Sequence, residues 1–222
     1  SKPVALIMRK NTFSPKVIKH KDDELKGKYT AYPSREEIIR VIISIVKKDI
    51  PIFSTTGMAS RELYENRKYK GQKPIDFYTV GGMGCCSSIA LGFIRSSRLE
   101  QVICVDGDGA LLMHMGSLMK IAKQPGFIHI IINNDSHDSV GGQPTGASDI
   151  NFIELGKSMG YGKIFSVSDL DQLAISIKEA LRCKDKSVML EMKSSKGSRK
   201  DLGRPSESPI ENKKTFIDTW SN

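Results

Sequence analysis

The sequence predicts a doubly wound α/β domain in which helices cover both faces of a mostly parallel sheet. Three observations support this fold class: short β-branched apolar runs recur along the chain, capped amphipathic segments separate them, and glycine-rich turns follow several of the runs. The 222 residues suffice for one large domain, and a hydrophobic fraction of 39% with a charged fraction of 27% is ordinary for a globular protein. No apolar run approaches the length that a membrane-spanning helix needs.

The regular part of the pattern begins after Pro33. Ser34 and Glu37 have the spacing of a capping box, and apolar residues at helical spacing continue to Val46. The apolar runs that we expect to be strands are 51–55, 76–80, 101–105, 127–132, 163–167 and 188–192. The segments that we expect to be helices between them are 61–67, 84–94, 112–122, 150–159 and 168–182. Strands that alternate with helices in this way favour parallel pairing.

The N-terminal segment differs from the rest of the chain. Residues 4–8 are apolar and predict a short strand, whereas 9–31 are polar, rich in lysine and without helical spacing, as in a linker. A single strand before a linker has no sheet of its own. We therefore expect residues 1–32 to be a strand and linker that remain from a preceding domain, and residues 33–222 to be the α/β domain.

A net charge of +9 is compatible with nucleic-acid binding, but no zinc-finger or interleaved aromatic pattern accompanies it. The same charge would attract a small anionic substrate, so we expect no nucleic-acid partner and no membrane partner. The cysteines are Cys85, Cys86, Cys104 and Cys183, and they form no C-x-x-C pair, which disfavours a structural zinc site. Packing of reduced thiols is the simpler interpretation, and it predicts a cytoplasmic protein.

The loops that follow four of the predicted strands carry the candidate chemistry. They are 55–57, 81–84, 107–109 and 133–136, and they are rich in glycine, threonine, aspartate and asparagine. In a parallel sheet these loops meet at one edge, which is where ligands bind in such folds. Glycines let the backbone approach a ligand closely, and helix N-termini offer N–H groups to an anion.

Asp108 and Asn134 follow two strands that are separated by one helix, so we expect them at adjacent strand ends. A carboxylate and an amide oxygen form an oxygen-only site of the kind that Mg²⁺ prefers, with phosphate oxygens and water completing the shell. The chain has no G-x-G-x-x-G turn after a strand and no Walker sequence, which argues against nicotinamide and P-loop nucleotide binding.

The combination of Gly107-Asp108-Gly109 with Asn133-Asn134 resembles the signature of thiamine diphosphate-dependent enzymes. This resemblance implies the thiamine diphosphate-binding fold, with thiamine diphosphate and Mg²⁺ as cofactors. It implies that the metal ligands are the side chains of Asp108 and Asn134 and the backbone carbonyl of Ser136. The cofactor-binding residues that it implies are Thr56, Gly57, Gly81, Gly82, Met83, Gly107, Asp108, Gly109, Ala110, Asn134 and Ser136.

Within this set the resemblance also implies roles. Gly109 and Ala110 would present backbone N–H groups to the diphosphate, and the Gly81 carbonyl would accept a hydrogen bond from the aminopyrimidine ring. Met83 would hold the cofactor in its bent conformation, although a core methionine is an equally ordinary interpretation of that residue.

Longer stretches resemble the phosphonopyruvate decarboxylase family more narrowly. They are 54–57 with 60–64, 112–116, 137–145 and 197–205. The implied reaction is decarboxylation of 3-phosphonopyruvate to phosphonoacetaldehyde, with a small anionic 2-keto acid as substrate. The candidate catalytic residues are His114, His137, Ser139, Gln143 and Arg61, and the 137–145 loop has a Gly141-Gly142 hinge that would let it close over the substrate. Asp135 departs from the family, which more often has glycine there.

The resemblance further implies a pyrimidine-binding domain whose glutamate activates the cofactor. No such domain fits before Ser34, so we expect it to come from the same or another chain, in a homo-oligomer, and this chain alone not to turn over. Three alternatives stay open at this point: the cofactor-binding subunit of a sulfopyruvate decarboxylase, an acetolactate synthase-like carboligase, and a non-catalytic anion- or nucleic-acid-binding module.

Overall fold

The computed structural model describes residues 3–9, 12–13, 31–46 and 48–220. Its six strands form one sheet in the order β2-β1-β3-β4-β6-β5, and every neighbouring pair is parallel. The strands are β1 (Ile52–Ser54), β2 (Phe77–Tyr78), β3 (Val102–Gly107), β4 (Phe127–Asn133), β5 (Lys163–Val167) and β6 (Val188–Lys193). The predicted parallel α/β sheet is therefore confirmed.

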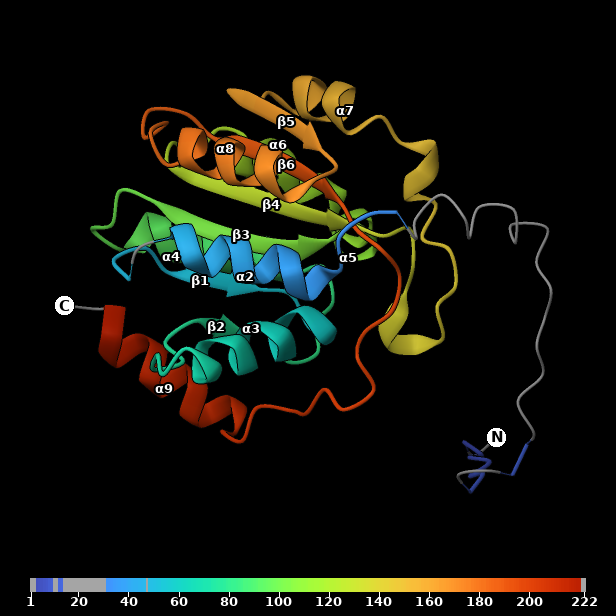
Figure 1. The fold of residues 1–222 in the computed structure, drawn as a ribbon. Helices are drawn as coiled ribbons and strands as arrows, with labels where there is room; N and C mark the ends of the chain where they lie inside the picture. Colours follow the sequence, from blue (N-terminus) through green and yellow to red (C-terminus); the bar gives the residue numbers. More distant parts are fainter. Residues whose placement is uncertain (1–2, 10–11, 14–30, 47, 221–222) are drawn as a thin grey trace.

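Helices cover both faces of the sheet (Figure 1). The helices of the described residues are α2 (Arg35–Ile45), α3 (Met58–Tyr69), α4 (Cys86–Ser96), α5 (Asp108–Met113), α6 (Leu118–Ile121), α7 (Phe152–Met159), α8 (Leu170–Ala180) and α9 (Pro209–Trp220). Short 3-10 turns lie at Met115–Ser117 (η2), Asp138–Val140 (η3) and Ala147–Asp149 (η4). No helix among the described residues is both long and apolar enough to span a bilayer.

Two apolar clusters fill the spaces between the sheet and its helices. On one face, α2, α3 and α8 bury residues such as Ile38, Leu63 and Ile177 against the sheet. On the other face, α4, α5, α6, α7 and α9 pack residues such as Cys86 and Phe216. The central strands β3 and β4 contribute side chains to both clusters, which explains their continuous apolar sequence.

Local sequence signals explain where several helices begin. At α2, the Ser34 hydroxyl accepts from the backbone N–H of Glu37, and the Glu37 carboxylate accepts from the Ser34 N–H, so the predicted capping box is confirmed. The side chains of Asn151 and Asp169 cap α7 and α8 by accepting hydrogen bonds from backbone N–H groups of the first turn.

Two predicted elements need comment. Residues 4–8 pair with no strand of this sheet, and Val4, Leu6 and Ile7 are largely exposed, so a strand that belongs to a preceding domain stays a prediction. The linker predicted for 9–31 lies almost entirely outside the described residues. The single helix predicted for 112–122 is instead α5, η2 and α6, because His114 leaves helical geometry with φ −133° and ψ 39°.

Helix α9 was not predicted from the sequence. Ser208 and Glu211 form a capping box at its start, and Pro209 occupies the first helical position. The helix covers the edge strand β2: the Asn212 side chain accepts from the Tyr78 N–H and donates to the Asp76 carbonyl. This cover protects a sheet edge that would otherwise be open.

Candidate active site

A cleft opens at the carboxyl ends of β1, β3 and β4, where the strand arrows of Figure 1 end beside the loop that follows β4. Loops that were predicted to meet at one edge therefore do meet. The cleft is lined by Arg35, Thr55, Thr56, Met58, Ala59, Met83, Asp106, Gly107, Asp108, Gly109, Ala110, Ile132, Asn134, Ser136, His137, Asp138 and Ser139.

Asp108 is the first residue of α5 and lies at the floor of this cleft, almost fully buried. Its carboxylate accepts a hydrogen bond of 2.5 Å from the hydroxyl of Thr145, which also donates to Asp135 at 3.2 Å. Burial raises the pKa of Asp108 to about 6, and the Thr145 hydrogen bond opposes that rise. A carboxylate in this setting is poorly solvated, so a cation beside it would be strongly favoured.

Asn134 follows β4, next to Asp108, as the sequence predicted. Its side-chain nitrogen donates to the Asp138 carboxylate at 2.7 Å, and its oxygen accepts from the Ser136 N–H at 3.1 Å. Asp135 between them has a φ of +50°, in the left-handed region that glycine adopts most easily. This backbone angle is the physical reason why glycine would be typical at that position.

A buried ion-pair network that sequence reasoning missed adjoins Asn134. Arg35, at the first position of α2, donates two hydrogen bonds to Glu62 of α3, at 2.8 and 3.0 Å. Its third nitrogen donates to Asp138 at 3.0 Å. No local pattern could have revealed this network, since Arg35 and Asp138 lie more than a hundred positions apart in the chain.

The glycines of the cleft permit close approach of neighbouring segments. A Cβ at Gly109 would lie 2.6 Å from the imidazole of His137, so only glycine lets the loop after β4 lie against the start of α5. Gly81 and Gly82 both have positive φ, and the Gly81 N–H donates to the Thr56 hydroxyl at 3.2 Å. Met83, from the same turn, lines the cleft.

The structure separates the predicted catalytic residues into two groups. His137 and Ser139 line the cleft. Arg61, His114 and Gln143 are not among the lining residues: His114 is exposed with its Nδ1 3.9 Å from the Cys85 sulfur, and Gln143 contributes its backbone carbonyl to the His137 N–H. Each of the three lies on a segment adjacent to the cleft.

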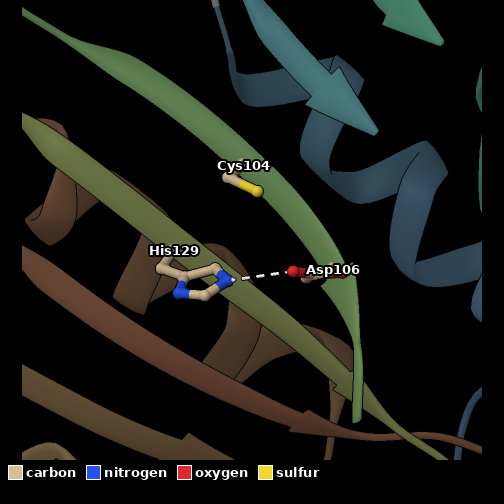
Figure 2. Close-up of side chains that lie close together, drawn as sticks. All are labelled: Cys104, Asp106 and His129. Atoms are coloured by element: carbon tan, nitrogen blue, oxygen red, sulfur yellow. Dashed lines mark hydrogen bonds and ion pairs between the residues drawn. The ribbon is translucent and has the colours of Figure 1, made fainter. Parts of the chain in front are cut away.

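Asp106, which lines the cleft, lies close to Cys104 and His129 (Figure 2), with one potential ligand atom of each within 4.8 Å of the others. His129 Nε2 is 3.5 Å from Asp106 Oδ2, and His129 Nδ1 is 3.0 Å from the Tyr161 hydroxyl. All of these side chains are buried, and burial raises the pKa of the Cys104 thiol well above its usual range. The contacts describe a satisfied polar cluster that stabilises the end of β3.

The lining residues fit a divalent cation with a diphosphate. Asp108 and Asn134 offer hard oxygen ligands, and their neighbours at the start of α5 carry no side chain larger than alanine at Gly109 and Ala110. Thr55 also lines the cleft, and its buried hydroxyl has no hydrogen-bond partner among the described residues.

Comparison with known proteins identifies the family. Residues 55–192 match the model of the thiamine pyrophosphate enzyme, C-terminal TPP binding domain, thiamine pyrophosphate being another name for thiamine diphosphate. The chain therefore belongs to the thiamine pyrophosphate enzyme family.

The relatives that are similar to this chain include two kinds of decarboxylase. A phosphonopyruvate decarboxylase from Streptomyces viridochromogenes is 33% identical over 86% of this chain and 47% of its own length. A sulfopyruvate decarboxylase subunit beta from Methanocaldococcus jannaschii is 36% identical over 69% of this chain and 81% of its own length. The chain thus spans about half the length of the phosphonopyruvate decarboxylases that it matches.

Solved structures support the fold. A benzoylformate decarboxylase from Polynucleobacter necessarius superposes with a TM-score of 0.58 at 20% identity, over 77% of this chain and 34% of its own. At that identity the likeness concerns the fold alone, and it confirms the predicted doubly wound α/β fold.

Proposed function

We propose that this chain is the diphosphate- and Mg²⁺-binding part of a thiamine diphosphate-dependent decarboxylase that converts 3-phosphonopyruvate to phosphonoacetaldehyde and CO₂. The observation that carries the proposal is the placement of Asp108 and Asn134 at adjacent strand ends, facing one cleft beside the Gly107–Gly109 turn. The identity to phosphonopyruvate decarboxylases over most of the chain supports the choice of substrate.

In this proposal the chain's own residues bind and orient. Asp108, Asn134 and the Ser136 carbonyl would hold Mg²⁺, and the N–H groups at the start of α5 would face the diphosphate. Bound thiamine diphosphate would supply the electron sink for the decarboxylation. His137 and Ser139 line the same cleft and would donate hydrogen bonds to the substrate from the loop after β4.

We further propose that activity requires a pyrimidine-binding domain from outside these residues, in the same or another polypeptide of an oligomer. The relatives support this, since the phosphonopyruvate decarboxylases are about twice as long as the matched region and the M. jannaschii relative is named as a beta subunit. Cytoplasmic location and the absence of a nucleic-acid partner remain predictions from the sequence.

Sulfopyruvate decarboxylation is a second candidate, because the beta subunits are at least as similar in identity and are covered over more of their length. Sulfonate and phosphonate tails are both small anions, so the family likeness does not separate them.

The test is a decarboxylation assay of the complete enzyme, this chain with its pyrimidine-binding domain, on 3-phosphonopyruvate and sulfopyruvate, with calorimetry of thiamine diphosphate binding with and without Mg²⁺. The proposal expects Mg²⁺-dependent binding and a higher kcat/KM for the phosphonate. A higher kcat/KM for sulfopyruvate would contradict the proposed substrate and support sulfopyruvate decarboxylation instead. Absence of thiamine diphosphate binding by the complete enzyme would refute both.

A further inference from the structure

We propose that Asp138 is a positioning residue that fixes which end of the Asn134 amide faces the metal site. This inference rests on the proposed function, because it concerns how a ligand of the expected Mg²⁺ is held. Neither the sequence patterns nor the relatives assign a role to Asp138.

The two ends of an asparagine amide have almost the same shape but opposite chemistry. Only the oxygen can ligate Mg²⁺, whereas the NH₂ group would repel it. An asparagine ligand therefore needs neighbours that hold its amide in one of two nearly isosteric orientations. An aspartate ligand has no such requirement, because both of its ends are oxygens.

Asp138 provides this discrimination through a carboxylate that can only accept. Its Oδ2 receives the Asn134 NH₂ at 2.7 Å, a distance typical of a strong, charge-assisted hydrogen bond. On the other side, the Asn134 oxygen accepts the Ser136 N–H at 3.1 Å and keeps a second lone pair. A flipped amide would place an oxygen against a carboxylate and an NH₂ group against an N–H, so both contacts would become repulsive.

The carboxylate of Asp138 accepts from two further donors besides Asn134. The same Oδ2 accepts from Arg35 Nη1 at 3.0 Å and from the Gly197 N–H at 3.0 Å. Arg35 cannot swing away, because Glu62 holds two of its nitrogens and the whole pair is buried. The network thus connects the start of α2, helix α3 and the segment after β6 to one side-chain amide.

The convergence of three donors on one oxygen makes a discriminating test possible. Asp138→Asn can place its amide oxygen where Oδ2 lies, so it loses the charge but keeps the acceptor for Asn134. Asp138→Ala loses both. If Asp138 acts by orienting Asn134, Asp138→Asn keeps metal affinity within about threefold, and Asp138→Ala loses about tenfold or more, the range of one charge-assisted hydrogen bond.

The experiment measures Mn²⁺ affinity by electron paramagnetic resonance in the complete enzyme with thiamine diphosphate present, for Asp138→Ala in two backgrounds. In the Asn134 background we expect the loss given above. In an Asn134→Asp background, where both ends of the side chain are oxygens and no orientation has to be chosen, we expect Asp138→Ala to leave Mn²⁺ affinity unchanged within about threefold. Urea unfolding of each variant accompanies the titrations. Should Asp138→Ala not fold, Asp138→Leu fills the same space with an apolar side chain and removes the same acceptor, while Arg35 stays paired with Glu62.

An equal loss in both backgrounds would overturn the inference, because it would mean that Asp138 acts through overall structure or charge. An equal loss for Asp138→Asn and Asp138→Ala would also overturn it. Neither result would affect the proposed function. If the unsubstituted enzyme binds no Mn²⁺ with thiamine diphosphate, the proposed function fails and this inference fails with it.

Discussion

Asp108→Asn is expected to stabilise the metal-free protein at pH 8 while removing its response to Mg²⁺ and thiamine diphosphate. Burial raises the pKa of Asp108 to about 6 from an ordinary value of 3.8. A folded-state pKa above the unfolded one means that the group favours folding below about pH 4, and that this contribution is lost as the pH rises through about 6. The shift of about two pH units corresponds to about 3 kcal/mol at pH 8.

Asparagine never ionises, so it avoids that cost. It accepts the Thr145 and backbone hydrogen bonds less strongly than a carboxylate does, and this weaker bonding lowers the unfolding free energy by about 1 kcal/mol. We therefore expect a net gain in unfolding free energy of about 2 kcal/mol at pH 8 and none at pH 4. With Mg²⁺ and cofactor in excess, the order reverses, because only the unsubstituted protein is stabilised by binding.

The assay is urea unfolding at pH 4 and pH 8, with and without ligands, followed by fluorescence of Trp220, the single tryptophan of the chain. Trp220 packs on Phe216 and donates to the Ile75 carbonyl, so its emission reports the docking of α9 on the sheet. The reasoning would be refuted if Asp108→Asn were less stable than the unsubstituted protein at pH 8 without ligands. That result would mean that burial of the ionised Asp108 carboxylate does not destabilise the fold.

Three further substitutions test other parts of the structure. Gly109→Ala places a Cβ 2.6 Å from the His137 imidazole, so we expect a loss of about 1–3 kcal/mol in urea unfolding and weaker thiamine diphosphate binding by calorimetry; normal binding would show that the loop yields freely. Thr145→Val removes the hydroxyl that hydrogen-bonds to Asp108 and Asp135 and should cost about 1–2 kcal/mol in urea unfolding. The Thr145 hydrogen bond lowers the pKa of Asp108, which is about 6, so the deficit should shrink as the pH falls below about 6; a pH-independent deficit would contradict that explanation. At Gly126 a Cβ would overlap the Glu100 carbonyl, and φ is +73°, so Gly126→Ala should destabilise the protein by about 2 kcal/mol or more. The metal affinity of the protein that remains folded should not change, and a loss of affinity would show that Gly126 is not independent of the site.

The parts of the site that could be predicted are those that short local motifs at the ends of strands encode. Asp108 and Asn134 each follow a clear strand, and parallel topology brings the ends of consecutive strands together. The sheet was predictable for the same reason, since strand β4 is seven residues of almost unbroken apolar sequence. The capping residues Ser208, Pro209 and Glu211 also indicate the start of helix α9. The helix was not predicted because it lacks a strongly apolar face.

What the sequence did not reveal are contacts between distant segments. Arg35 looks like an ordinary residue of a helix first turn, and only the fold places it against Glu62 and Asp138. His129 lies within an apolar strand, and its polar partners come from the neighbouring strand β3 and from Tyr161. Side-chain pairing of this kind depends on packing in three dimensions, and no spacing rule along the chain encodes it.

The charges of the cleft constrain how an anionic substrate could be recognised. Its lining has three carboxylates, Asp106, Asp108 and Asp138, and one guanidinium, that of Arg35. Arg35 is already paired with two acids, so it is a poor anchor for a further anion. A diphosphate would meet net negative charge without a metal, which makes a divalent cation a physical requirement of the proposed function. A phosphonate or sulfonate tail would add more negative charge than this lining balances. Under the proposed function, the cation that recognises that tail is therefore expected from outside the cleft, and the pyrimidine-binding domain is the first place to look for it.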